Sequence, residues 1–379
     1  MIKLGIENID KYLDLFNNKR VGLITNHTGL DQSLKSTIDI LNEKVNLVAL
    51  FAPEHGIRGD LEAGVKLDTY KDEETNLTVY SLYGQTRKPT KEMLENVDIL
   101  CFDIQDVGAR FYTYIYTMAY GMMAAKENNI EFVVFDRPNP LGGKRVEGNI
   151  LDLKYRSFVG YYPILQRHGL TVGELAKMFN NEFEINSKLT VVPMENWKRE
   201  MTFFDTKLNY VLPSPNLPTI ESTFAYLATC YFEGTNISEG RGTTRPFSQF
   251  GAPWLNNKEL IKRLNSKNFK GVKFRQSYFT PTFSKHDGNL CRGVELLIED
   301  YESFEPVILG MTILKLINEM HEEFEFRGPY RKDGEPMINL LIGDNFIREN
   351  NLTINEIKNK FKEDKQKYEE MKGKYHIYD

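Results

Sequence analysis

Residues Val97–Ile104 read VDILCFDI, and a second apolar run, Ile130–Phe135 (IEFVVF), follows after a segment of helical length, Phe111–Asn128. Continuous apolar runs of this length are typical of parallel strands buried on both faces, and parallel neighbours are joined by a crossover that is usually a helix. The stretch therefore predicts a strand–helix–strand unit, the building block of a parallel sheet.

The same pattern extends toward the N-terminus. Three further apolar runs, Arg20–Thr25 (RVGLIT), Val45–Ala52 (VNLVALFA) and Leu77–Leu82, indicate strands, and Gln32–Leu41 has apolar residues at helical spacing. Leu170–Phe183 also predicts a helix, because Thr171 and Glu174 have the spacing of a capping box. We predict an α/β fold with a Rossmann-like parallel sheet in a catalytic domain over residues 1–230.

The pattern changes in the second half of the chain. A glycine-rich, charged segment, 233–245 (EGTNISEGRGTTR), leads into short helices and alternating, strand-like segments. We predict a smaller α+β domain over residues 231–379 that completes a cleft with the first. The expected elements are helices at Leu255–Asn265, Pro306–Glu322 and Ile354–Lys372, and strands at Phe269–Phe283 and Gly293–Glu299.

Composition excludes several classes of protein. The 379 residues carry 48 Lys and Arg against 53 Asp and Glu, a net charge of −5, which disfavours binding to nucleic acid. Three cysteines are too few for a disulfide framework. No apolar stretch predicts membrane insertion, and the start, MIKLGIENIDKYL, does not resemble a secretory signal. We expect a cytoplasmic protein as given, or an extracellular or wall-associated one if a leader was removed.

The loops carry little sign of a cofactor or metal. The turn after the first strand, TNHTGLD, lacks the GxGxxG fingerprint of dinucleotide binding. Asp103, Asp106 and Asp136 could gather at strand ends around a hard cation. The favoured interpretation is that they cap helices and pair with Arg110 and Arg137. We therefore predict no cofactor and no metal.

Polar loops follow the strands, at the edge where open α/β sheets bind their ligands. In Pro53–Asp60 (PEHGIRGD), Glu54 comes directly after a buried strand and precedes His55. A carboxyl group in such a place suits general-acid work in glycoside hydrolysis. The alternative is a loop carboxylate that pairs with Arg58.

Two further constellations stand out. Asp106, Arg110, Tyr112 and Tyr114 lie at a strand end and the start of a helix, where Arg can bind a carboxylate and Tyr can stack on a sugar. Ordinary helix packing is the alternative. The glycine-rich segment places polar groups beside an interdomain cleft, or is a solvated connector; its candidates are Glu233, Asn236, Glu239 and Arg241.

Taken together, six motifs in fixed order identify a family. GLITNHTG, APEHGIRGD, DIQDVGARFYTY, DRPNPLGG, PSPNLP and EGTNISEGRGT resemble the bacterial exo-β-N-acetylmuramidase family, over most of the chain. The resemblance implies a glycosidase of peptidoglycan turnover that releases terminal, non-reducing N-acetylmuramic acid from a muropeptide or peptidoglycan disaccharide. It implies neither a nucleotide nor a metal.

From the resemblance and the chemistry together we predict catalytic and substrate-binding residues. The catalytic candidates are Glu54 as acid, His55, and Asp106 (or Glu239) as the second group, unless the N-acetyl group of the substrate assists. Arg110 or Arg241 would bind the lactyl carboxylate. The predicted substrate-binding residues are Asn26, Arg58, Arg110, Tyr112, Tyr114, Asn216, Glu239 and Arg241.

Two other functions remain open from the sequence. A non-catalytic protein that binds cell-wall fragments would share the cleft. A Rossmann oxidoreductase would share the sheet, although the glycine fingerprint is missing. Fold alone does not separate these functions, because function depends on the site.

Overall fold

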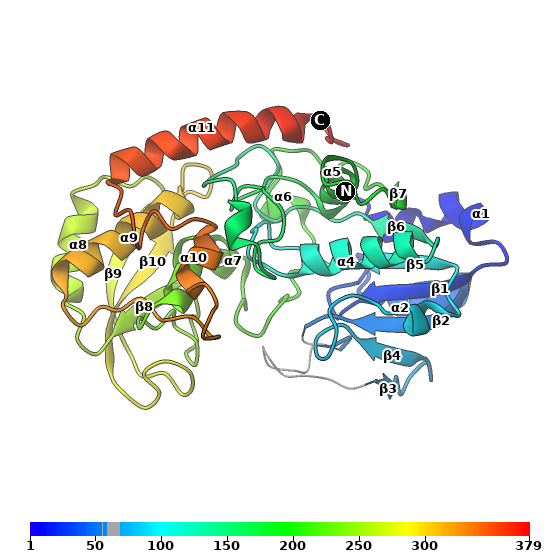
Figure 1. Cartoon of the computed structure of the whole chain (residues 1–379), viewed down its shortest axis with the longest axis horizontal. Coiled ribbons are helices and arrows are strands. Elements are labelled where there is room, and N and C mark those ends of the chain that lie inside the picture. The colour runs from blue at the N-terminus through cyan, green and yellow to red at the C-terminus, as the bar shows by residue number, and fades with distance from the viewer. Residues whose placement is uncertain (55, 59–68) are drawn as a thin grey trace.

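The computed structural model describes residues 1–54, 56–58 and 69–379. It has two lobes that lie side by side, one built on a seven-stranded sheet and a smaller one built on a three-stranded sheet (Figure 1). The predicted fold class, α/β with a smaller second domain, is confirmed.

The large sheet has the strand order β3-β4-β2-β1-β5-β6-β7, and all its pairs are parallel except β3 with β4. Each apolar run quoted above forms a strand of this sheet. The strands are β1 (Arg20–Thr25), β2 (Asn46–Ala52), β3 (Tyr70–Lys71), β4 (Thr78–Ser81), β5 (Ile99–Asp103), β6 (Glu131–Phe135) and β7 (Lys188–Val192).

Helices cover both faces of this sheet, which explains why its strands are continuously apolar. On one face α4 (Tyr114–Glu127) and α5 (Val172–Glu182) pack on alternate strand residues such as Phe102. On the other face η1 (Gly5–Tyr12) and α2 (Thr37–Lys44) pack on the intervening residues such as Cys101. Alternate side chains of each strand thus enter two separate cores.

Local capping decides where these helices begin. The predicted capping box of α5 is present, with Thr171 and Glu174 each accepting the other's main-chain N–H. The prediction that a helix begins at Gln32 is wrong. The Asp31 carboxylate accepts the N–H groups of Ser33 and Lys35, which closes a turn there, and Ser36 then caps α2.

The smaller lobe is an antiparallel sheet, in the order β8-β10-β9, against a helical layer. Its core is continuous with residues that follow β5, such as Phe111. The strands are β8 (Gln249–Ala252), β9 (Val272–Phe279) and β10 (Cys291–Ile298), and the helices are α7 (Ile220–Thr229), α8 (Asn257–Asn265), α9 (Pro306–Met320) and α10 (Met337–Ile342). Short elements elsewhere are α1 (Leu13–Phe16), α3 (Lys91–Leu94), η2 (Leu153–Tyr155), α6 (Phe203–Thr206) and η3 (Cys230–Gly234). Within the described residues, no helix has the length and apolar character to cross a membrane.

The helix α11 (Ile354–Gly373) runs from the smaller lobe back across the large lobe (Figure 1). On the large lobe, the Tyr368 hydroxyl donates to the His168 carbonyl at 3.0 Å, and the Lys372 ammonium donates to the Gly143 carbonyl at 2.8 Å. Beyond the helix, the Tyr378 hydroxyl donates to the Asp136 carboxylate at 2.6 Å. The last part of the chain therefore ties the two lobes together.

Burial of Lys372 makes this attachment sensitive to pH. Burial, together with the charge of Arg199, lowers the pKa of Lys372 from 10.5 to about 8. Above pH 8 the folded state loses this proton while the unfolded state keeps it to about pH 10.5, so this residue makes stability rise with pH in that window. We expect urea unfolding to show that wild type gains stability relative to Lys372→Met between about pH 8 and about pH 10.

The matched control for this prediction is Lys365→Met on the same helix. Lys365 is about half exposed and pairs with Glu369 at 3.8 Å. Its removal should leave the pH dependence of stability unchanged. A wild-type curve parallel to that of Lys372→Met across the window would contradict the buried-charge account.

Candidate active site

A cavity of about 640 Å³ lies between the two lobes. The large lobe lines it with the loops after β2 and β4 and with residues 111–114, which lead into α4. Residues 154–159 form a further wall, and the smaller lobe contributes Tyr226, Glu233, Arg241 and residues around 330–340. Its size suits a sugar-sized ligand.

Glu54 lines this cavity, directly after β2. Its carboxylate accepts a hydrogen bond from the Thr113 hydroxyl at 3.4 Å. Tyr83 lies against the same carboxylate: burial, the charge of Glu54 and their hydrogen bond raise the pKa of Tyr83 to about 12. Two neutral hydroxyl groups therefore orient this acid.

No ion pair involves Glu54 among the residues that the structure describes. The pairing with Arg58 that the sequence left open is not formed, because Arg58 binds Asp72 and Glu74, each at 2.9 Å. Arg58 does not line the cavity either, so its predicted contact with substrate does not fit this geometry.

Tyr112 and Tyr114 line the cavity beside Glu54. Both hydroxyls donate to the Pro213 carbonyl, at 3.0 and 2.9 Å, and the two rings meet edge to face with centroids 4.9 Å apart. The hydroxyls thus hold the Pro-rich loop, residues 212–218 (LPSPNLP), in place beside the cavity.

In the smaller lobe, Arg241 reaches the cavity but is already paired. It binds Glu233 at 2.6 Å and Glu239 at 3.2 Å. Glu239 is only 2% exposed, also pairs with Lys285 at 2.6 Å, and does not line the cavity. Glu233 is the carboxylate of this network that lines the cavity.

The prediction of Asp106 as a catalytic group does not fit the structure. Asp106 is buried and outside the cavity lining. One carboxylate oxygen accepts the Gly108 N–H at 2.7 Å and lies 3.1 Å from His168 Nε2. This carboxylate therefore shapes the loop after β5.

The prediction of Arg110 as the cation for the lactyl group is wrong in this structure. Its side chain has no exposed surface, and its guanidinium donates to the carbonyls of Asn149, Ile164, Leu341 and Ile342, at 2.5–3.1 Å. These carbonyls come from both lobes. Arg110 is thus a structural connection between them.

None of the remaining predicted residues that the structure describes is placed in the cavity lining. Asn26 is buried behind Tyr114, where its side-chain oxygen accepts the N–H and hydroxyl of Thr28. Asn216 is 5% exposed in the Pro-rich loop. Neither lines the cavity. His55 lies outside the described residues.

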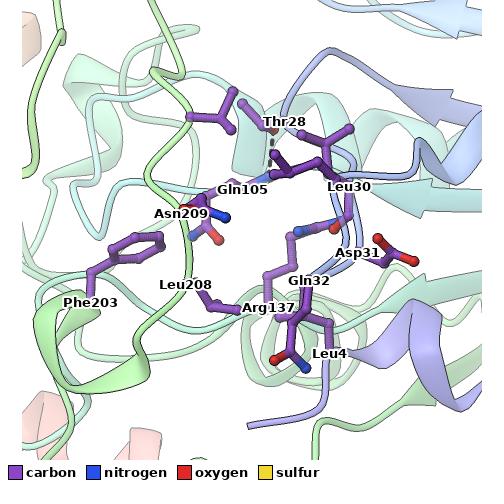
Figure 2. Close-up of a pocket in the computed structure, with 12 residues that line it drawn as sticks. Leu4, Thr28, Leu30, Asp31, Gln32, Gln105, Arg137, Phe203, Leu208 and Asn209 are labelled. Atoms are coloured by element: carbon purple, nitrogen blue, oxygen red, sulfur yellow. Dashed lines mark hydrogen bonds between the residues drawn. The ribbon is translucent and has the colours of Figure 1, made fainter. Parts of the chain in front are cut away.

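The switch point of the parallel sheet, between β1 and β5, holds a separate and much smaller cavity (Figure 2). Its volume is about 40 Å³, which leaves room for no more than a few water molecules. Arg137 enters it and pairs with Asp103 through two nitrogens. This is where a Rossmann oxidoreductase would bind its nucleotide, so the geometry gives that alternative no support.

The aspartates considered for a cation have protein partners. Asp103 binds Arg137 as expected, and Asp136 accepts from Thr171, Gly173 and Tyr378. In the ranges 1–54, 56–58 and 69–379 no cluster of three His, Cys, Asp or Glu side chains has metal-binding geometry.

Comparison with known proteins agrees with these features. Residues 21–221 match the family model "Exo-beta-N-acetylmuramidase NamZ, N-terminal", and residues 224–378 match the corresponding C-terminal model. The chain belongs to the NamZ family.

The similarity to individual NamZ relatives extends over the whole chain. The chain is 53% identical over 386 residues to "Peptidoglycan beta-N-acetylmuramidase NamZ" of Bacillus subtilis (strain 168), and the match covers all of this chain and 91% of that protein. Two crystal structures of DUF1343 family proteins from Bacteroides fragilis NCTC 9343 also match. BF0371 has a TM-score of 0.90 at 38% identity and BF0379 a TM-score of 0.80 at 33%, each covering all of this chain and 99% of the other.

Sequence reasoning missed several residues of the cavity. Tyr83 and Arg87 follow β4 in SLYGQTRKPT, and Arg156 and Phe158 lie in KYRSFVG. The first segment could have been found, because it follows a strand directly, as Glu54 does. Nothing in the second segment marks it as part of a site.

Proposed function

We propose that this chain is a glycosidase, an exo-β-N-acetylmuramidase that releases terminal, non-reducing N-acetylmuramic acid from peptidoglycan fragments. The observation that carries the proposal is the carboxylate of Glu54, held by hydroxyl groups and without an ion-pair partner among the described residues, on the wall of an interlobe cavity. Membership in the NamZ family and the named activity of the Bacillus subtilis relative support the same reaction.

In this proposal Glu54, when protonated, donates its proton to the glycosidic oxygen as the bond to the sugar breaks. Thr113 and Tyr83 fix the direction of the carboxyl group. The aromatic walls, Phe111, Tyr112 and Tyr226, pack against the sugar and exclude water.

A second group stabilises the positive charge that develops on the sugar or activates water. Glu233 takes this place in the proposal, instead of Asp106 or Glu239, because it lines the cavity and pairs there with Arg241 at 2.6 Å. The N-acetyl group of the substrate is the alternative nucleophile.

The direct test is hydrolysis of a chromogenic N-acetylmuramide by the purified chain. We expect release of the chromophore together with free N-acetylmuramic acid, and much slower release from the matched N-acetylglucosaminide. A disaccharide with N-acetylmuramic acid at its non-reducing end should be cleaved, and one with this sugar at its reducing end should not. Tight binding of the muramide without turnover would instead favour a non-catalytic wall-fragment binding protein.

A further inference from the structure

Two arginines on one wall of the interlobe cavity are held by aromatic rings. The guanidinium carbon of Arg87 lies 3.9 Å from the ring centroid of Phe158, and that of Arg156 lies 4.6 Å from the ring centroid of Tyr161. Tyr120 joins the two arrangements, because its ring stacks on Phe158 and meets Tyr161 edge to face. The result is a ring-held pair, Arg87 and Arg156, on one aromatic cluster.

Both guanidinium groups act on a common neighbour, the Tyr120 side chain, against which the two rings that hold them pack. Burial raises the pKa of Tyr120, and the positive charges of Arg87 and Arg156 both oppose that shift. Two positive charges that line the same cavity attract an anionic group of a ligand. The pair therefore has the electrostatics of an anion site.

Within the described parts of the chain, neither arginine has a carboxylate partner. Arg156 gives one N–H to the Tyr161 carbonyl at 2.9 Å. Arg241, in the same cavity, is by contrast occupied by two glutamates. Among the residues that the structure describes, no carboxylate therefore competes with a ligand for the outer N–H groups of the ring-held pair.

Arg87 also lies on the side of the cavity that carries Glu54. Tyr83, whose hydroxyl contacts the Glu54 carboxylate, is in turn within the electrostatic range of Arg87. Arg87, Arg156 and Phe158 all line the cavity with Glu54. A ligand whose reacting bond lies at Glu54 can therefore place a substituent at the ring-held pair.

We propose that Arg87 and Arg156 bind the carboxylate carried by the substituent on the terminal sugar, and so determine specificity for N-acetylmuramic acid. The inference rests on the proposed function. A guanidinium offers a planar fork that fits a carboxylate, and stacking on a ring fixes that fork in advance. The carboxylate belongs either to the lactyl group itself or to a stem peptide attached to it.

The experiment compares three chromogenic muramides: one with a free lactyl carboxylate, one with a neutral lactyl methylamide, and one carrying L-alanyl-D-glutamate. We expect Arg87→Gln and Arg156→Gln each to raise KM by about 10- to 100-fold on a substrate with the recognised carboxylate. The KM for the neutral methylamide should change by less than about threefold in the same variants. Arg87→Lys keeps the charge but not the planar fork, so its KM should lie between those of wild type and Arg87→Gln.

The substrate that loses affinity identifies the source of the carboxylate. A rise in KM on the free lactyl substrate assigns the site to the lactyl group, and a rise on the peptide substrate alone assigns it to the stem peptide. Equal losses on the methylamide, or no loss on any substrate, would overturn the inference. The control is Lys88→Gln, which removes the neighbouring cation, paired with Glu127 at 2.7 Å, and should change none of these values.

Binding measurements separate this inference from the proposed function. Calorimetric titration with free N-acetylmuramic acid, and with the same sugar carrying the dipeptide, reads the site without turnover. If wild type hydrolyses no muramide, the proposed function fails. If both sugars bind equally well to wild type and to Arg87→Gln, the ring-held pair has no role in recognition.

Discussion

Replacing Glu54 with Gln should lower kcat on an N-acetylmuramide with a poor leaving group by about 10²- to 10⁴-fold, the range for losing a general acid. The amide has nearly the same shape and still accepts from Thr113, but its N–H groups are too weakly acidic to protonate the leaving oxygen. The substrate should continue to bind, so KM should change little. The measurement is steady-state kinetics on an alkyl or disaccharide glycoside.

The leaving group distinguishes a general acid from other roles. A dinitrophenyl glycoside departs without protonation, so Glu54→Gln should recover most of the wild-type rate on it. If Glu54 were instead the nucleophile, Glu54→Gln should lower kcat equally on both substrates. The matched control is Glu74→Gln, an exposed carboxylate paired with Arg58, which should retain full activity. Near wild-type turnover of all substrates by folded Glu54→Gln would remove this residue from the mechanism.

Arg110→Met should reduce the free energy of unfolding by about 3 kcal/mol or more, because four buried carbonyls lose their donors at once. The methionine fills the space but supplies no N–H group. Those carbonyls belong to both lobes, so the loss should appear as one weaker cooperative transition. Urea unfolding followed by fluorescence gives the value.

The control and the conservative variant make this stability result interpretable. Arg263→Met removes an exposed arginine that pairs with Glu259 along α8, and should cost less than about 0.5 kcal/mol. If Arg110→Met does not fold, Arg110→Lys, which keeps the charge and some donors, should fold with reduced stability. A stable Arg110→Met that loses activity only on muramides would restore the role in substrate binding first predicted from the sequence.

The parallel sheet can be predicted from the sequence because the burial of each strand determines its own residue pattern. Strands buried on both faces are continuously apolar, so the quoted runs match β1, β2, β4, β5 and β6 to within two residues. Short elements are different. β8 has only four residues, and its pairing with β10 depends on contacts far away in the chain. No local pattern encodes such a strand.

The site is predictable only in part, for a related reason. Glu54, Tyr112 and Arg241 are polar or aromatic groups at strand ends and loops, and they do line the cavity. Arg110 and Arg87 occupy similar loops after strands, yet one is buried among carbonyls and the other faces the cavity. What separates them is the set of distant groups that surrounds each guanidinium, and a motif does not contain that information.

The hydrogen bond between Asp136 and Tyr378 joins residues 242 positions apart, and it has a consequence for how the protein is made. The ribosome delivers nearly all of the sheet lobe before α11 emerges. Until then Asp136 lacks the Tyr378 hydroxyl, and the Gly143 and His168 carbonyls lack the hydrogen bonds that Lys372 and Tyr368 donate. Dissecting the polypeptide at the junction of the two family matches would leave the first fragment permanently in that state. The halves are consecutive in sequence, but the first is completed only by the end of the second.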